Sequence, residues 1–302
     1  MTTKLVSLLT LLLLTGCEPA AAPAPGEATL PRFQVIGKLQ SEKIDEASGI
    51  QAGNGGVYFV HNDEGTRIYA VDEGGRDLGD IKIKGASNRD WEDITRVIGD
   101  EGPLLVIADV GDNLQSRKKV SLYFIREPAA GSYSGKQNPA HRVDVRYPDG
   151  PRDVEAVAYD SFNDMILFMS KRDQPPRLYG VPLDLALWEQ EVEAIFLAEV
   201  PVFRPPTRLD ILRNPKRGMW VSQPTGMDIS ADGRTAAVIT YRSLYLFERK
   251  SGESWAEAFQ RTPVEYPGPP GLQEEAVAFG HEPGSIIVTT EGRPAPVYKL
   301  EP

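Results

Sequence analysis

Residues 153–184 read DVEAVAYDSFNDMILFMSKRDQPPRLYGVPLD. Two acidic residues open a short apolar strand, a turn containing Asn and Asp follows, and a second apolar strand ends in Lys and Arg. A third strand alternates between polar and apolar residues around Tyr179. The stretch therefore predicts three short β-strands joined by turns.

Four further segments, which begin at Glu46, Asp90, Gln223 and Gln273, repeat this order of features. A fourth strand fits four of the five units, at residues 78–85, 141–148, 193–203 and 259–267. The units align on Ser48, Glu92, Glu155, Thr225 and Glu275, with spacings of 44, 63, 70 and 50 residues. Repetition of a small sheet along the chain is typical of β-propellers, in which each sheet is a blade.

The fifth unit has residues for only three strands, and an isolated alternating strand, RFQVIGKLQ at Arg32–Gln40, precedes the first unit. If this strand completes the last blade, it pairs an edge that would otherwise be open to aggregation. We therefore predict an all-β fold over residues 32–302, a five-bladed β-propeller closed by its N-terminal strand. A six-bladed propeller is the alternative, with residues 207–222 as a degenerate blade. Leu185–Ala194 is the best candidate for a helix.

The N-terminal residues have the features of a secretion signal. A mostly apolar run of ten residues, Leu5–Leu14, is shorter than the roughly 20 residues of a transmembrane helix. The LTGC sequence that ends at Cys17 resembles the bacterial lipobox, whose cysteine is lipidated. We therefore expect a signal peptide over residues 1–17 and a Pro- and Ala-rich tether over residues 18–31. A plain signal peptide with a spare thiol is the alternative.

The same residues and the overall charge bear on location and partners. Glu18 after the cysteine implies, by the sorting rule of bacterial lipoproteins, a lipid anchor in the cell envelope on the periplasmic face of the outer membrane. Cys17 is the only cysteine, so the mature chain can form no internal disulfide. With 33 Lys and Arg against 43 Asp and Glu, the net charge is −10. This excess of acid repels phosphate backbones, so we expect a small molecule, a glycan or a protein as partner and no nucleic acid.

In a propeller, the first strand of each blade begins, and the second ends, on one face around the central channel. The strand starts and ends of this chain carry many charged side chains. The oxygen-bearing candidates for a metal site are Asp90, Glu92, Asp109, Asp112, Asn113, Asp153, Glu155 and Glu275. The candidates for ligand binding are His61, Asp63, Lys171, Arg172, Arg242, Glu291 and Arg293.

These acids require compensating cations. Two carboxylates about 4 Å apart repel by roughly 4 kcal/mol at an effective dielectric constant near 20. A Ca²⁺ ion, which prefers six to eight oxygen ligands, would supply the charge, and the ADVGDN loop at residues 108–113 has suitable residue types. The alternatives are a salt-bridge lattice with the basic candidates, and ordinary turn residues in the loop.

Several motifs resemble those of bacterial secreted and lipoprotein β-propellers of unassigned function. They are DWEDI at 90–94, ADVGDN at 108–113, DVEAVAYD at 153–160, TGMDISADGR at 225–234 and QEEAVAF at 273–279. More loosely, the chain is similar to the esterase-like phytase and SdiA-regulated types of extracytoplasmic propeller, some of which carry calcium. Gln223 and Thr225 depart from the acidic pattern in the fourth unit.

Two classes of function remain open. No G-x-S-x-G, H-E-x-x-H, P-loop or G-x-G-x-x-G motif occurs, which favours a lipid-anchored binding propeller that uses its charged central face. The alternative is a phytase-like, Ca²⁺-assisted hydrolase of phosphate esters, in which Lys171, Arg242 and Arg293 bind the phosphate. A basic stretch at 214–217 is either a solvated loop or a lid for an anionic ligand.

Overall fold

The computed structural model describes residues 31–269 and 274–301. The predictions about the signal peptide, the lipidation of Cys17 and the tether fall outside these residues, Pro31 apart, and stay predictions.

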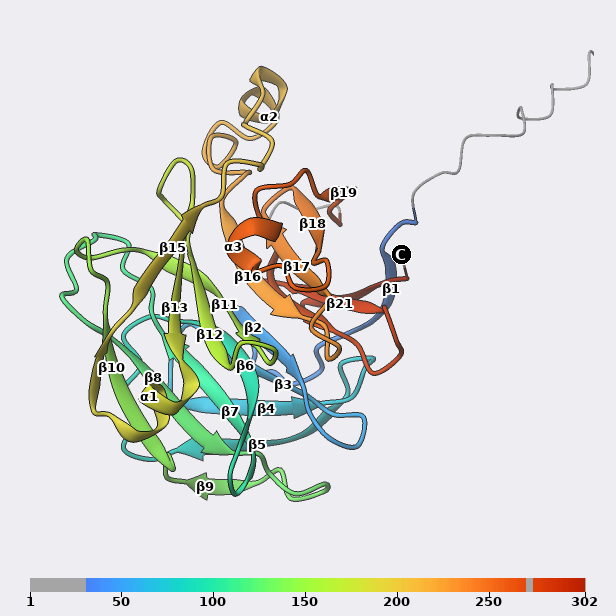
Figure 1. Ribbon diagram of the computed structural model, residues 1–302. Helices are drawn as coiled ribbons and strands as arrows, with labels where there is room; N and C mark the ends of the chain where they lie inside the picture. Colours follow the sequence, from blue (N-terminus) through green and yellow to red (C-terminus); the bar gives the residue numbers. More distant parts are fainter. Residues whose placement is uncertain (1–30, 270–273, 302) are drawn as a thin grey trace, which may run out of the picture. The chain divides into compact units, whose positions relative to one another are not determined.

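The strands form five mainly antiparallel sheets, which are the five blades of a β-propeller (Figure 1). Blade 1 contains β2 (Ala47–Ala52), β3 (Tyr58–Asn62), β4 (Arg67–Val71) and β5 (Asp77–Ile83). Blade 2 contains β6 (Trp91–Gly99), β7 (Gly102–Asp109), β8 (Val120–Arg126) and β10 (His141–Arg146). Blade 3 contains β11 (Val154–Asp160), β12 (Met165–Ser170), β13 (Arg177–Pro182) and β15 (Ile195–Glu199). Blade 4 contains β16 (Pro224–Ile229), β17 (Thr235–Thr240), β18 (Ser243–Glu248) and β19 (Val264–Pro267).

Blade 5 contains β20 (Glu274–Phe279), β21 (Ile286–Thr290) and β22 (Pro296–Leu300), and its fourth strand is β1 (Gln34–Lys38). The innermost strands β2, β6, β11, β16 and β20 each pack against the next, and β20 packs against β2. The predicted five-bladed propeller is therefore confirmed, and so is its closure by the N-terminal strand.

The closing segment contacts both ends of the ring. β1 pairs antiparallel with β22, and the Leu39 amide donates to the Ala295 carbonyl at 2.8 Å. The next amide, that of Gln40, donates to Gly75 in the β4–β5 turn of blade 1 at 2.9 Å. Gly75 has φ +82°, and a Cβ there would lie 2.4 Å from the Lys38 carbonyl oxygen. Only glycine allows the two backbones to approach this closely.

Two short strands were not predicted from the sequence. β9 (Gly135–Gln137) pairs parallel to β5, and β14 (Glu191–Glu193) pairs parallel to β10. Each adds a fifth strand to the outer edge of its blade, because the chain passes that edge on its way through the following blade. The outer edges of blades 1 and 2 are thereby covered.

In residues 31–269 and 274–301, three short helices lie in the connections: α1 (Leu183–Trp188), α2 (Arg208–Arg213) and α3 (Trp255–Ala258). The helix predicted at 185–194 is correct only in its first half, because its second half is β14. Residues 207–222 contain α2 and no strand, so the six-bladed alternative is wrong. None of the described helices has the length and apolar character needed to cross a membrane.

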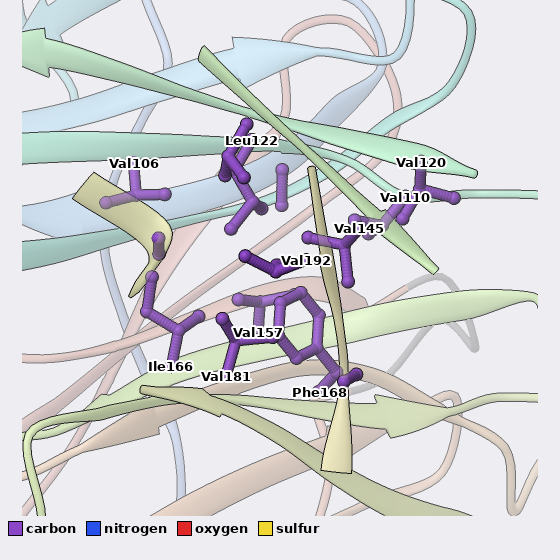
Figure 2. Packing of buried hydrophobic residues seen from close by; sticks show 14 of the residues in the cluster. Val106, Val110, Val120, Leu122, Val145, Val157, Ile166, Phe168, Val181 and Val192 are labelled. Atoms are coloured by element: carbon purple, nitrogen blue, oxygen red, sulfur yellow. The ribbon is translucent and has the colours of Figure 1, made fainter. Parts of the chain in front are cut away.

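The hydrophobic core lies between neighbouring blades. Figure 2 shows the cluster shared by blades 2 and 3, in which the side chains of Val106, Leu122, Val145, Val157, Ile166 and Phe168 are buried. The first three come from blade 2 and the others from blade 3. Since each blade covers the face of the next, no blade can be removed without exposing two such faces.

We predict that removal of residues 31–38 destabilises the ring, because it deletes β1 and leaves β22 as an unpaired edge strand. The truncated chain should melt at a lower temperature than a chain that begins at Pro31, and it should self-associate. Thermal unfolding and light scattering measure the two effects. A monomer with unchanged melting temperature would contradict this role for β1.

Candidate functional site

Each innermost strand carries one extra residue at the same position of its blade. The pairing with the second strand shifts by one residue there, which is a β-bulge. The extra residues are Ser48, Glu92, Glu155, Thr225 and Glu275, and all five are buried. Bulges commonly turn a side chain toward a functional site. Here the five bulges place one polar side chain per blade around the channel.

Three carboxylates meet at this position. One oxygen each of Glu92, Asp153 and Glu155 lie within 4.8 Å of one another, and all three residues are buried. Ser48 Oγ lies 3.3 Å from Glu92 Oε2 and donates to it. We call Asp90, Glu92, Asp153, Glu155 and Glu275 the acidic ring.

Lys171 is the buried cation of the acidic ring. Its Nζ donates to Glu155 Oε1 and, at 2.9 Å, to the Tyr241 hydroxyl. Burial alone would lower the pKa of Lys171, but Glu155, Tyr241 and Glu275 raise it above its ordinary value. Lys171 is therefore charged at neutral pH and neutralises one carboxylate.

Two arginines form ion pairs with acids in the ring or in the loop next to it. Arg172 forms an ion pair with Asp153 and also donates to Asn113 Oδ1. Arg117, which was not predicted, forms an ion pair with Asp109 at 3.0 Å and donates to the Gly111 carbonyl at 2.6 Å. No sequence pattern points to Arg117, since it lies in a polar loop six residues after Gly111.

The ADVGDN loop is held by these contacts. Asp109 Oδ1 also accepts from the Asp90 amide at 3.1 Å, and Asp112 Oδ2 accepts from the Arg117 amide at 2.7 Å. The Asp112 amide in turn donates to Asp153 Oδ1 at 2.8 Å. Asp109 and Asp112 therefore hold the loop in shape. For these two residues the contacts favour the interpretation as turn residues over that as metal ligands.

Gly111 is the point at which the loop meets the acids. A Cβ at this position would lie 2.2 Å from Glu92 Oε1 and 2.6 Å from Asp90 Oδ2. The two carboxylates thus lie close together against the backbone of Gly111. Any larger residue would displace them.

The acidic ring holds more negative charge than its cations neutralise. Burial raises the pKa of Glu92 well above its ordinary value, and the charges of Glu155 and Asp90 raise it further. Burial and the Glu155 charge do the same for Glu275, although Lys171 opposes them. Glu155 Oε2 is buried without a hydrogen-bond partner among the described residues. The excess negative charge of the ring therefore favours either protonation of some carboxylates or binding of an added cation.

Asp63 lies beside the ring. Burial raises its pKa to about 7, the charges of Glu291, Glu46 and Asp90 act in the same direction, and a hydrogen bond with Ser48 opposes them.

The other predicted ligand-binding residues have different surroundings. His61 is buried, stacks edge-on against Trp91 at 5.6 Å, and burial lowers its pKa to about 4. It is therefore a neutral core residue. Glu291 is 3.7 Å from the guanidinium of Arg217.

Arg242 and Arg293 form their described ion pairs outside the acidic ring. Arg242 pairs with Asp210 of α2 at 2.9 Å and donates to Ser222 at 3.2 Å. Arg293 is half exposed and lies 3.8 Å from Glu42. The salt-bridge lattice proposed from the sequence thus contains Lys171 and Arg172 but not these two arginines.

Two further buried acids, missed by the sequence analysis, accept hydrogen bonds from other blades. Asp93 accepts from the amides of Val157 at 2.8 Å and Met227 at 3.2 Å, which belong to blades 3 and 4. Asp228 of blade 4 accepts from the Phe279 amide of blade 5 at 2.8 Å. Both carboxylates satisfy backbone donors that the ring geometry leaves unpaired. The signal available in the sequence was an acid in a strand that is otherwise apolar.

A cavity of about 160 Å³ adjoins Lys171. Its wall is mostly apolar and is formed by the segment that precedes β16 together with the turn after β12. The residues that form it include Pro175, Pro201, Phe203, Pro206 and Met219.

No protein-family model and no curated protein matches this chain. Among solved structures, a luciferin-regenerating enzyme is similar at 9% identity and a TM-score of 0.47, covering 90% of this chain and 95% of that one. The PQQ-bound aldose sugar dehydrogenase of Streptomyces coelicolor has 12% identity and a TM-score of 0.46, with 89% and 97% covered. A proposed gluconolactonase has 12% identity and a TM-score of 0.47, with 90% and 92% covered.

At these identities and scores the likeness concerns the fold and carries no argument about a reaction or a ligand. The narrower resemblance to secreted and lipoprotein propellers stays a prediction.

We predict that the metal-free protein loses stability as the pH rises from about 5 to 8. Burial raises the pKa of Asp63 and that of Asp228 to about 7, whereas an unfolded aspartate titrates near 4. Between these values the folded state binds more protons than the unfolded state, so the free energy of unfolding falls with increasing pH. Glu92 and Glu275 act in the same direction, and His61 opposes them below about pH 6.5.

Urea unfolding in EDTA at several pH values measures this dependence. Asp63→Asn should flatten it, whereas Asp100→Asn, at an exposed turn, should not. A stability that rises steadily to pH 8 would show that the acids do not share the buried environment described here.

We predict that Asp93→Asn lowers the free energy of unfolding by about 2–3 kcal/mol, because the amide NH₂ would face backbone donors that now share a carboxylate. The Asp100→Asn variant serves again as control. Equal stability of the two variants would refute a structural role for Asp93.

Proposed function

We propose that this protein is a lipid-anchored extracytoplasmic β-propeller that binds Ca²⁺ in its acidic ring and a small organic ligand beside it. The observation that carries the proposal is the convergence of the buried carboxylates of Glu92, Asp153 and Glu155. The cations that pair with the ring, Lys171 and Arg172, leave it with excess negative charge, and a divalent ion would neutralise most of that excess.

The residues fit a calcium ion chemically. Ca²⁺ takes oxygen ligands at about 2.3–2.6 Å, so ligands on opposite sides of the ion are about 5 Å apart. The three carboxylates offer oxygens within 4.8 Å of one another. Asp90 meets Glu92 at Gly111 and adds a further carboxylate. When bound, the ion would neutralise these groups and offer a positive charge to an oxygen atom of a ligand.

The cavity beside Lys171 indicates the size and character of that ligand. A space of about 160 Å³ is comparable with a cavity of about 150 Å³ that takes up benzene. Its walls contain several prolines, which restrict the backbone and favour a preformed pocket. A molecule with one ring-sized apolar group and an oxygen directed toward Lys171 would satisfy both parts of the site. This feature favours a small molecule over a glycan or a protein.

The hydrolase alternative has less support. Phosphate binding in that hypothesis used Lys171, Arg242 and Arg293, but Arg242 is paired with Asp210 and Arg293 lies near Glu42. Of these three residues only Lys171 lies beside the acidic ring, and it already contacts Glu155. The arrangement therefore favours binding over phosphate-ester hydrolysis.

The anchor is part of the proposal. Support comes from the sequence LTGC at residues 14–17, with Cys17 as the lipidated residue, and from Glu18 for retention on the periplasmic face of the outer membrane. The tether at 18–31 would then separate the propeller from the bilayer.

We predict that Ca²⁺ raises the free energy of unfolding by about 2.7 kcal/mol at a hundredfold excess over the dissociation constant, through binding to the folded state alone. Glu155→Gln and Asp153→Asn should abolish this gain. Glu64→Gln, an exposed change near the same face, should keep it. The measurement is the shift in thermal unfolding when Ca²⁺ is added to each variant, so that a lower starting stability does not enter the comparison.

Absence of a shift with the unaltered protein would refute the calcium site. Assays of phosphate esters with the same variants separate the two functions. Turnover that needs both Ca²⁺ and Glu155 would favour the hydrolase, whereas a calcium shift without turnover is the result expected for a binding protein.

A further inference from the structure

The connection between β15 and β16 contains a segment with little packing against the blades. We call residues 207–220 the projecting tip. It includes α2, none of whose residues is buried, and in Figure 1 α2 lies beyond the ends of the strands at the top of the view. A helix of six residues is too short to be stable by itself in water, so its order needs another source.

Local hydrogen bonds supply that order. Thr207 and Asp210 form a reciprocal capping box at the start of α2. The Gly218 amide donates to the Asn214 carbonyl at 2.7 Å, and a Cβ on Gly218 would lie 2.4 Å from the Asp210 carbonyl oxygen. Arg242 ties Asp210 to blade 4 at 2.9 Å. The tip is therefore held in shape without burying its own apolar side chains.

Those apolar side chains are exposed to an unusual degree. Leu212 is 76% exposed and Met219 is 64% exposed. Leu209, Ile211 and Trp220 are also exposed. Single exposed apolar residues are ordinary, but five within twelve positions concentrate apolar surface on one short segment, which is typical of an interaction surface.

The charge of the tip is opposite to that of the protein. Arg208, Arg213 and Lys216 are exposed, and no ion pair joins them to an acid in the described part of the chain. The whole chain has a net charge of −10. The surface that fits the tip is therefore both anionic and able to accept apolar side chains.

We propose that the projecting tip docks on an anionic phospholipid bilayer. Leucine, methionine and tryptophan next to arginine and lysine form the composition of segments that lie in a membrane interface. Basic residues near such a surface are attracted by anionic headgroups. Because the tip extends beyond the strands, it can touch a flat bilayer while the acidic blades stay farther away, where salt screens their repulsion over about 8 Å.

An acidic protein is the less suitable partner. A bilayer offers anionic headgroups and an apolar interior side by side over its whole surface, whereas a protein must combine the two at one matching patch. The docking surface is separate from the acidic ring, and its proposal does not depend on calcium binding.

The test uses residues 31–302, which form one compact unit by themselves, so that neither lipid nor signal peptide contributes. Flotation with vesicles of phosphatidylglycerol and phosphatidylcholine should recover the protein, and vesicles of phosphatidylcholine alone should recover at least about tenfold less, since each basic residue adds to binding only at an anionic surface. One variant combines Leu212→Ser with Trp220→Ser. A second combines Arg208→Glu, Arg213→Glu and Lys216→Glu.

Both variants should lose binding to the anionic vesicles by at least about tenfold, since each removes one of the two attractive components. Matched controls are Trp188→Ser, an exposed tryptophan elsewhere, and Lys84→Glu with Arg89→Glu and Lys118→Glu, three exposed charges elsewhere. The controls should bind as the unaltered protein does. Thermal unfolding should be unchanged in every variant, because none of these side chains is buried.

Three results would overturn the proposal. The first is no recovery with anionic vesicles, and the second is an equal loss in the control variants. The third is self-association in solution that only the tip variants abolish, which would assign the tip to a second copy of the chain.

Discussion

The pairing of β1 with β22 is the contact on which the rest of the structure depends. It joins the first segment of the domain to the last blade by backbone hydrogen bonds, and the amide of Gln40 then bonds to blade 1. Side-chain packing between blades can resist sliding, but an unpaired edge strand remains open to other chains. Closure removes that edge and fixes how far apart the inner strands lie. At this spacing the bulged Ser48 donates to Glu92, and Glu92 lies near Glu155 of the next blade.

The buried acids of this propeller have two different roles, which their hydrogen-bond partners distinguish. Asp93 and Asp228 accept backbone amides from other blades and so connect the inner strands. Glu92 and Glu275 face other carboxylates, and burial together with those charges raises the pKa of each. A group of mutually repelling acids lowers the stability of the fold in which it is held. The interblade cores supply the stability that maintains it. The proposed calcium site would explain why the fold keeps a group of acids that destabilises it.

The projecting tip adjoins the cavity beside Lys171, which in turn adjoins the acidic ring. Ser222, which follows the tip, lines the cavity beside Lys171, and Arg217 of the tip lies 3.7 Å from Glu291. If both proposals hold, a tip docked on a bilayer would bring the cavity close to the membrane surface. The protein would then meet its small ligand near the lipid headgroups. The lipidated tether and the tip would then be two separate contacts with a membrane. Because only the tip is part of the propeller, only the tip would orient the blades relative to the membrane.

The sequence alone determined that the fold is a propeller of repeated blades, because the blade unit is local. Turn residues and alternating strands occur in the same order five times, and an isolated strand at 32–40 could complete the last blade. The structure excluded a sixth blade, because residues 207–222 contain α2 and no strand. The acidic residues at the strand starts could be identified for the same reason, since each lies at one position of the repeat. Their convergence around the channel could be predicted from propeller geometry, in which the first strands of all blades begin on one face.

Only the tertiary structure decided which charges meet. Arg117 pairs with Asp109, and Arg242 turns toward α2, because loop paths rather than repeat positions place these long side chains. The strands β9 and β14 form because the chain happens to pass an open blade edge. Asp93 and Asp228 became visible as cross-blade contacts only when the amides of neighbouring strands were in place. Local pattern fixes the elements and their repeat, whereas hydrogen bonds and ion pairs between distant residues depend on the path of the chain in space.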